Sequence, residues 1–310
     1  MLIRETATIQ AAIDSLDLSL LDEFVFPKKR TINLRADFKS PMMLSAHNIK
    51  HLNKIPELDT DAVILNLEDG VSNAMKPFAL RLAMLALSAL PESDKKMIVR
   101  VNALDEGGDA EIEMLNSCRP DAIRVPKVRS AEDVKRALTL CDKAIELHLS
   151  IETKEAWLQL AQLKVDARVT TFYLGILDLF ADMGLSQELI RVDNPLMHHI
   201  LSQFLLTSRA VGAKAVSFVY QDYKDEAGFQ AWLDLEKRLG YDAKGCLSPN
   251  QAVLAHTTFS VDAEALERAR YIIEHFEAKR ERGITGFSDE RYGFIDEPIY
   301  KGALALLNNS

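Results

Sequence analysis

The chain has 310 residues, of which 48% are hydrophobic and 27% charged, a composition that excludes general disorder and allows one large α/β domain or two small ones. Its formal net charge of −9 argues against a nucleic-acid partner, because phosphate binding depends on clustered Lys and Arg. Three widely spaced cysteines suggest neither a disulfide framework nor a zinc site, and no signal-peptide pattern or apolar run of about 18 residues is present, so we expect a cytoplasmic protein without membrane contact.

Short apolar runs alternate with longer helical patterns from about residue 41 onward, which indicates repeated βα units around a parallel sheet. Eight runs are rich in β-branched or aliphatic residues: Met42–Ser45, Ala62–Leu67, Met97–Val101, Ala122–Val125, Glu146–Ile151, Thr171–Gly175, Ala215–Val219 and Lys244–Leu247. Helical stretches with apolar residues three and four apart lie between them: Lys76–Leu90, Ala131–Cys141, Lys154–Leu163, Pro195–Val211 and Glu226–Leu239. Ser130 and Asp133 form a predicted capping box at the start of one helix.

Eight such units fit a closed (β/α)₈ barrel, a TIM barrel, better than an open doubly wound sheet, which usually carries a Gly-rich first turn that this chain lacks. We therefore predict an α/β protein with its catalytic TIM barrel over residues 40–260. Residues 1–39 are predicted to be an N-terminal arm, and residues 261–310 a C-terminal helical extension. Within the extension, Ala263–Arg280 has the pattern of an amphipathic helix.

Polar residues stand where most of the predicted strands end, and in a barrel these carboxyl ends surround the active site. The set is Glu68, Asp69, Arg100, Asn102, Lys127, Glu152, Asp178 and Ser248. Burial of such charges is costly unless they bind one another, a metal or a substrate. Their convergence on one opening predicts a catalytic site.

Glu152 and Asp178 follow neighbouring predicted strands and are candidate ligands of Mg²⁺ or Mn²⁺, with coordination positions left for a substrate. The alternative is that each carboxylate only caps the helix after its strand. The predicted position of Arg100 at the same opening favours the metal, because caps do not require a cation and two anions to converge.

Arg100 is a candidate clamp for a carboxylate or for a developing enolate oxygen. A buried salt bridge to Glu68 or Asp69 is its alternative, and both can hold at once. Lys127 is a candidate Schiff-base amine, but a Lys at a strand end is more often an ion-pair partner, which we favour.

Two further pairs have simpler interpretations. His47 and His51 stand four residues apart without the Glu of a metalloprotease pattern, so we interpret them as a solvated helix face. Asp222 and Asp225 are interpreted as residues of a helix N-terminus.

Several motifs follow one another from about Lys39 to Leu307: Leu65–Gly70, Val99–Asn102, Val125–Val128, Ser130–Asp133, Ile151–Thr153, Leu174–Leu179, Leu247–Gln251 and Tyr292–Pro298. In this order they resemble the citrate lyase β-subunit-like (HpcH/HpaI aldolase) family. Each motif is weak alone, whereas the ordered series is specific.

The resemblance implies a TIM barrel that cleaves or forms a bond between a 2-keto acid and an acetyl unit, often carried as an acyl-CoA thioester. It implies that Glu152 and Asp178 hold Mg²⁺ and that Arg100 binds the carbonyl oxygen beside the metal. It also implies that Asp296 reaches a neighbouring subunit's site as the acid/base. We expect a 3-hydroxy-3-carboxyacyl thioester such as citramalyl-CoA, malyl-CoA or citryl-CoA as the substrate of this lyase.

The predicted site thus has three groups of residues. The catalytic residues are Arg100, Asp296 and Glu68, the substrate contacts are Arg100, Asn102, Lys39, Asp69 and Lys127, and the metal ligands are Glu152 and Asp178. We also expect a homotrimer or a multiple of it, because an apolar stripe on the helix of the extension needs a partner surface. The stripe comprises Ala265, Leu266, Ala269, Ile272, Ile273 and Phe276.

The chain departs from the pattern of the family it resembles at several positions near the site. Lys39-Ser40 stands in place of Arg-Ser, Ser45-Ala46 in place of a Pro-Gly turn, Asn66 in place of Asp, and Ser248 in place of His. Two alternatives stay open. One is a metal-dependent 2-keto acid aldolase that uses no thioester, and the other is a catalytically silent binding or assembly subunit.

Overall fold

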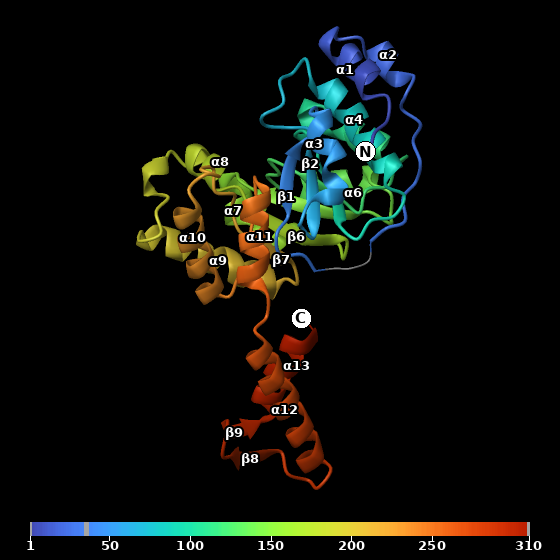
Figure 1. The fold of residues 1–310 in the computed structure, drawn as a ribbon. Coiled ribbons are helices and arrows are strands. Elements are labelled where there is room, and N and C mark those ends of the chain that lie inside the picture. Colours follow the sequence, from blue (N-terminus) through green and yellow to red (C-terminus); the bar gives the residue numbers. More distant parts are fainter. Residues whose placement is uncertain (1, 34–36, 309–310) are drawn as a thin grey trace. The chain divides into compact units, whose positions relative to one another are not determined.

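The structure is a computed structural model that describes residues 2–33 and 37–308. It divides into two compact units, Met1–Thr258 and Phe259–Ser310. Figure 1 shows the ribbon of both units, coloured along the sequence. Each unit has its own core and is described separately.

The first unit is built around a parallel sheet whose strands pair in chain order (Figure 1). The seven strands are β1 (Met42–Ser45), β2 (Ala62–Asn66), β3 (Lys96–Arg100), β4 (Ala122–Val125), β5 (Glu146–Ile151), β6 (Val169–Leu174) and β7 (Lys214–Val216). Aliphatic and β-branched side chains dominate them, as is typical of strands covered on both faces. The observed strands lie within the predicted runs or extend them by a few residues, except that β7 is shorter than predicted.

The predicted eighth strand closes the sheet into a barrel, although it is too short to be a named strand. Isolated parallel bridges join Ser217 to Lys244 and Met42 to Cys246. The Gly245 N–H donates to the Ser217 carbonyl at 3.1 Å, and the Met43 N–H donates to the Cys246 carbonyl at 2.8 Å. Residues 244–246 therefore pair with both β7 and β1, and the predicted (β/α)₈ barrel is confirmed.

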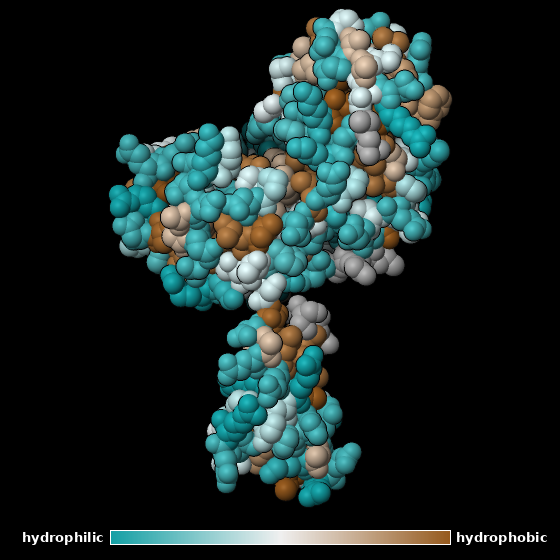
Figure 2. All heavy atoms as spheres, viewed as in Figure 1, coloured by the Kyte–Doolittle hydropathy of each residue, from teal (hydrophilic) through white to brown (hydrophobic). Residues whose placement is uncertain are grey.

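Helices surround the barrel and pack their apolar faces on the outer faces of the strands. They are α3 (Ile49–Asn53), α4 (Lys76–Ala89), α5 (Gly108–Leu115), α6 (Ala131–Leu140), α7 (Lys154–Leu158), α8 (Ile176–Asp182), α9 (Pro195–Ala210), α10 (Glu226–Leu239) and α11 (Pro249–Phe259), with short 3₁₀ turns η1 (Ile55–Glu57), η2 (Leu104–Glu106), η3 (Leu160–Leu163) and η4 (Gln187–Leu189). Hydrophilic residues cover most of the visible surface of this unit (Figure 2). The predicted capping box of Ser130 and Asp133 begins α6.

The inner and outer faces of the barrel differ in chemistry. Val63, Leu65 and Val99 are 0% exposed and belong to the face that packs on the helices. The intervening residues share the inner face, because the register pairs Asn66 with Arg100 and Arg100 with Arg124. Apolar inner residues fill the amino-terminal half of the barrel, where Phe38, Ala62, Ile64, Ile98, Ala122, Tyr173, Val216 and Ala243 form one cluster. The carboxyl-terminal half is polar, and this half contains the site.

The segment before the barrel contains two helices, α1 (Thr6–Asp14) and α2 (Leu18–Asp22). Arg30 attaches the same segment to the barrel by a fully buried ion pair with Asp121 at 3.2 Å. The Arg30 Nε also donates to the Leu90 carbonyl at 2.7 Å. These contacts explain why a segment without a strong sequence pattern adopts a definite position in the first unit.

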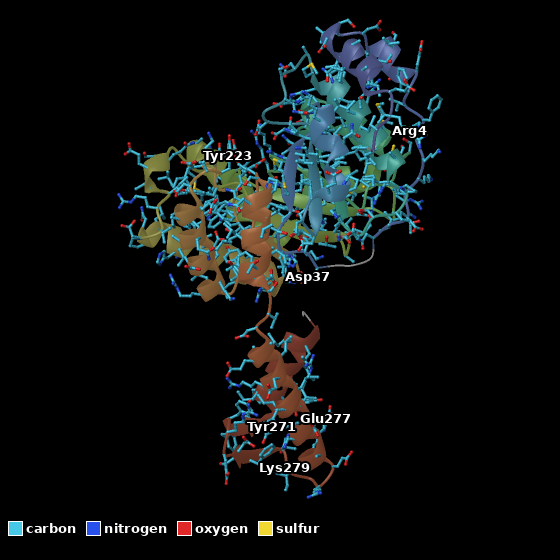
Figure 3. The ribbon with its side chains drawn as sticks, in the orientation of Figure 1. Arg4, Asp37, Tyr223, Tyr271, Glu277 and Lys279 are labelled. Carbon is cyan, nitrogen blue, oxygen red and sulfur yellow. The ribbon has the colours of Figure 1, made fainter. Side chains whose placement is uncertain are left out.

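The second unit consists of α12 (Ala263–Arg280), a hairpin of β8 (Gly286–Asp289) and β9 (Gly293–Asp296), and α13 (Glu297–Asn308). Figure 3 labels Tyr271 and Glu277 on α12. The apolar stripe of α12 packs within the unit, since Ile272 and Phe276 share a buried cluster with Tyr300 of α13. The argument that the whole stripe needs another subunit is therefore wrong, because α13 and β9 cover Ala269, Ile272 and Phe276, while Ala265 and Leu266 are half-exposed. No helix among the described residues is both long and apolar enough to cross a membrane.

Candidate active site

A cavity of about 310 Å³ opens at the carboxyl ends of the barrel strands, and we call it the barrel cavity. Its charged lining residues are Asp69, Arg100, Arg124, Glu152 and Asp178. They come from the ends of β2 to β6, as the geometry of a TIM barrel requires of an active site. The structure thus brings together most of the charged residues that the strand ends predicted.

Glu152 lies directly after β5, with its side chain 2% exposed. Its Oε1 accepts a hydrogen bond from the Lys127 N–H at 2.8 Å, and its Oε2 lies 3.8 Å from Arg100 Nη2. Burial raises the pKa of Glu152, and the positive charges of Arg100 and Arg124 oppose this effect. The helix that follows is capped by Thr153 instead, so the capping alternative is wrong for Glu152.

Asp178 lies in the first turn of α8 and lines the same cavity. Its negative charge contributes to the raised pKa of Glu152, so the two carboxylates lie close enough to interact. Gly175 leaves room for the side chain of Glu152, because a Cβ at residue 175 would lie 2.5 Å from Oε2 of Glu152. The predicted pair of metal ligands is therefore brought to one cavity, although Glu152 is buried and Asp178 is exposed.

Arg100 ends β3 and is 6% exposed. Its Nη2 contacts Oε2 of Glu68 and lies 3.4 Å from Oδ2 of Asp69. Its Nε is buried and has no hydrogen-bond partner among the residues that the structure describes. Arg100 therefore forms the predicted salt bridges and also lines the barrel cavity, while its role as a clamp for a substrate oxygen stays a prediction.

Lys127 is an ion-pair partner, as favoured from the sequence. Its Nζ lies 2.9 Å from Oε1 of Glu68 and 3.8 Å from Oδ1 of Asp69. Burial alone would lower the pKa of Lys127, but the hydrogen bond and charge of Glu68 raise it above its usual value. An amine that remains protonated is a poor Schiff-base nucleophile, so the structure gives no support to that role.

Asn102 and Lys39 do not reach the barrel cavity. The Asn102 Nδ2 donates to Oε1 of Glu111 at 2.6 Å and to the Leu67 carbonyl at 3.2 Å, and its side chain is buried away from the cavity lining. Lys39 precedes β1 at the amino-terminal end of the barrel, where its Nζ lies 3.9 Å from Asp37. The predicted contact of Lys39 with substrate is wrong, because the carboxyl ends of the strands lie at the other end of the barrel.

Two other predicted residues remain, Asp296 and Ser248. Asp296 belongs to the second unit, where its Oδ1 accepts a hydrogen bond from the Ile299 N–H at 3.2 Å. Its role as acid/base stays a prediction. Ser248 lines a second cavity of about 390 Å³.

The second cavity lies between the ends of β1 and the eighth strand and is also lined by His51, Lys54 and Tyr223. Figure 3 labels Tyr223. His47 precedes α3 and shares a 2.8 Å hydrogen bond with Ser45. The interpretation of His47 as part of a helix face is therefore wrong. Asp225, in contrast, begins α10 by accepting a hydrogen bond from the Gly228 N–H, as expected.

The sequence analysis missed Arg124, the inward-facing guanidinium next to Arg100. Arg124 is the residue before the last of β4, and its register partner on β3 is Arg100. The signal that was available is the single charge in the run Ala122–Val125, since a charge inside an apolar strand must face a polar interior or pair with another group.

Comparison with known proteins agrees with this geometry. Residues 39–249 match the HpcH/HpaI aldolase/citrate lyase family. A (3S)-malyl-CoA thioesterase of Cereibacter sphaeroides is 31% identical over 247 residues, which cover 79% of this chain and 85% of the relative. The mitochondrial citramalyl-CoA lyase of Homo sapiens is 24% identical over 323 residues, covering 97% of this chain and 91% of the relative.

Solved structures show the same similarity. The protein CitE of Mycobacterium tuberculosis in complex with magnesium, acetoacetate and coenzyme A has a TM-score of 0.68 at 26% identity, covering 89% of this chain and 99% of that chain. The citrate lyase beta subunit of M. tuberculosis complexed with oxaloacetate and magnesium has a TM-score of 0.64 at 27% identity, covering 74% and 100%. The expected enzyme class, a carbon–carbon lyase, is confirmed at the level of the family. The chain belongs to the HpcH/HpaI aldolase/citrate lyase family.

Proposed function

We propose that the protein is a Mg²⁺-dependent lyase that cleaves or forms a 3-hydroxy-3-carboxyacyl thioester, such as citramalyl-CoA, malyl-CoA or citryl-CoA. The observation that carries the proposal is the convergence of Glu152, Asp178 and Arg100 on the barrel cavity. Relatives named for citramalyl-CoA and malyl-CoA support this substrate class.

Glu152 and Asp178 fit an open magnesium site. Mg²⁺ usually takes one or two carboxylates from a protein and fills its other positions with water and substrate oxygens. In the described part of the chain no third His, Cys, Asp or Glu joins these two carboxylates in a group that could hold a metal, so water and substrate would have to fill the remaining positions. Bound between these carboxylates, Mg²⁺ would act as a Lewis acid toward the hydroxyl and carboxylate of the keto-acid half.

Arg100 is suited to stabilise the oxygen that becomes the ketone. Its ion pairs with Glu68 and Asp69 fix the plane of the guanidinium before substrate arrives, and preorganised donors of this kind supply much of the stabilisation in an active site. In this scheme Glu68 and Lys127 act as positioning residues, because Glu68 contacts Arg100 and Lys127 contacts Glu68.

The proposed reaction is a retro-Claisen cleavage. The substrate hydroxyl gives its proton to a base, the carbon–carbon bond breaks, and the bond electrons remain on the acyl half as a thioester enolate that is then protonated. We propose the Asp296 carboxylate as the base, from the resemblance of residues 292–298 to the family motif. On the same basis we propose a homotrimer or a multiple of it, in which a neighbouring chain supplies Asp296. A cytoplasmic location stays a prediction from composition.

A product assay separates this proposal from its alternatives. Purified full-length protein is incubated with citramalyl-, malyl- and citryl-CoA and with a panel of free hydroxy-keto acids, with Mg²⁺ or with chelator. A lyase releases a 2-keto acid while the acetyl thioester stays intact, whereas a thioesterase like the Cereibacter relative releases a free thiol and no keto acid. Turnover of free hydroxy-keto acids alone would identify the aldolase without a thioester. No turnover with any substrate, despite Mg²⁺ and keto-acid binding, would identify a silent subunit.

A further inference from the structure

Arg124 is a buried cation without a carboxylate partner. It is 6% exposed and lines the barrel cavity. Its Nε donates to Oγ of Ser150 at 2.8 Å, and its guanidinium carbon lies 4.1 Å from the centre of the Tyr173 ring. Within residues 2–33 and 37–308, no carboxylate oxygen lies within 4.0 Å of its guanidinium nitrogens. Its two direct side-chain contacts are therefore with neutral groups, and the carboxylates of Glu152 and Glu68 act on its charge only from a longer distance.

The neighbouring Arg100 has the opposite environment. Its Nη2 has three carboxylate partners, Glu68, Asp69 and Glu152. The two arginines are register partners on adjacent strands and face the same interior. Arg100 thus forms ion pairs within the protein, whereas among the described residues Arg124 forms none.

The charge of Arg124 persists at neutral pH. Burial, followed by the repulsion of Arg100, lowers the pKa of Arg124 to about 10, which still leaves it protonated. A buried charge without a partner is costly, and natural proteins retain such a charge where a ligand neutralises it. The neutral contacts to Ser150 and Tyr173 hold the guanidinium in place without using the negative charge that it requires.

We infer that Arg124 binds the second carboxylate of a dicarboxylic 2-keto acid half and so determines which substrate the site accepts. The inference rests on the proposed function, in which Glu152 and Asp178 bind the first carboxylate and the hydroxyl through the metal. A planar guanidinium forms paired hydrogen bonds to a carboxylate, and a methyl group at the same position would leave it unsatisfied. The site therefore selects a citryl-type substrate over a citramalyl-type one.

Calorimetric titration of the full chain in Mg²⁺ with (S)-malate and with (S)-2-hydroxybutyrate tests the inference. These stable acids share the hydroxyl and the first carboxylate, and malate carries a carboxylate where 2-hydroxybutyrate carries a methyl group. We expect wild-type protein to bind malate at least about tenfold more tightly, because only malate forms a charged hydrogen bond with the guanidinium. This ratio of affinities is measured on wild-type protein, so it does not depend on the folding of a variant.

Two variants assign the preference to one side chain. Arg124→Met keeps an unbranched chain and removes the charge, so we expect the preference to disappear while the affinity for 2-hydroxybutyrate is retained. Thermal unfolding of this variant should be unchanged or occur at a higher temperature, because an unpaired buried charge is lost. Asp222→Asn, outside the barrel cavity, serves as the matched control and should keep the wild-type preference.

Equal affinity of wild-type protein for the two acids overturns the inference, and so does a malate preference that survives Arg124→Met. The titration also distinguishes this failure from failure of the proposed function. If wild-type protein binds neither acid in Mg²⁺, or if Glu152→Gln binds both as wild type does, the metal-dependent function is wrong and the assignment of Arg124 fails with it.

Discussion

The Lys127 N–H donates a 2.8 Å hydrogen bond to Oε1 of Glu152, and this bond joins the ends of β4 and β5. Lys127 has a φ of 52°, a left-handed conformation that is unfavourable for a residue with a side chain. Such strain is found where the surrounding structure requires it, often at functional sites. Here the left-handed backbone of Lys127 directs its N–H to one oxygen of Glu152. The hydrogen bond holds the carboxylate in position before a ligand binds.

Glu152→Gln and Asp178→Asn are each expected to abolish Mg²⁺ binding and leave the fold intact, because both residues lie at the open end of the barrel and each loses a charged oxygen ligand. Calorimetric Mg²⁺ titration and circular dichroism measure the two effects. Asp182→Asn, one turn further along α8, is the matched control and should bind Mg²⁺ normally. Wild-type Mg²⁺ affinity in either site variant would contradict the metal assignment.

Gly175→Ala is expected to weaken Mg²⁺ binding by about tenfold or more, since a ligand carboxylate displaced from its preorganised geometry binds worse. The physical reason is that the new Cβ would lie 2.5 Å from Oε2 of Glu152, so the carboxylate must move. Gly302→Ala, in a helical position with open space around it, is the control. An unchanged Mg²⁺ affinity in Gly175→Ala would show that Glu152 tolerates the displacement or does not bind the metal.

Arg100→Lys is expected to lower kcat/KM by about 100-fold with little change in the unfolding temperature. Lysine keeps the positive charge beside Glu68 and Asp69, but its ammonium group cannot reproduce the planar set of donors. Steady-state kinetics and thermal melts separate the two quantities. Near-normal kinetics would reduce Arg100 to a structural ion-pair partner.

The raised pKa of Glu152 predicts two pH effects. As the pH is lowered, the Mg²⁺ affinity of the site should begin to fall at a pH above 4.5, the ordinary glutamate pKa. The reason is that protons compete with the metal for this buried carboxylate. Without metal, the folded protein carries the cost of the ionised group at pH 7, and that cost disappears as the pH falls below 4.5, where both the folded and the unfolded state become protonated. Glu152→Gln should therefore raise the free energy of unfolding at pH 7 but not at pH 4.

Denaturant titrations of the metal-free wild type and variant at several pH values measure this difference. A gain in the free energy of unfolding that increases toward low pH would indicate a lowered pKa in the folded protein, contrary to the expected sign.

Mixing two inactive variants tests whether a neighbouring chain completes the site. Asp296→Asn and Arg100→Ala proteins are combined under conditions of subunit exchange, and partial activity is expected, since some sites would then pair an intact barrel with an intact second unit. Mass spectrometry of the mixed oligomer verifies the exchange. No recovery after verified exchange would place Asp296 in its own chain's site or outside the chemistry.

The sequence determined the strands and most of the site because these depend on local patterns. Apolar runs bounded by polar residues located the barrel strands, and the residues just after them, such as Glu152 and Arg100, were identified from position alone. Strand ends in a parallel barrel meet at one opening whatever the details of packing, so their convergence followed from the fold class.

Only the tertiary structure decided features that depend on contacts between distant segments. The register of β3 and β4 places Arg124 beside Arg100, and no local pattern specifies that Arg124 lacks a carboxylate partner. Likewise, α13 covers the buried part of the apolar stripe of α12, which from sequence alone was expected to need another chain. A hydrophobic or charged side chain shows in the sequence what kind of partner it requires, whereas which group fulfils that requirement is set by the packing of the folded chain.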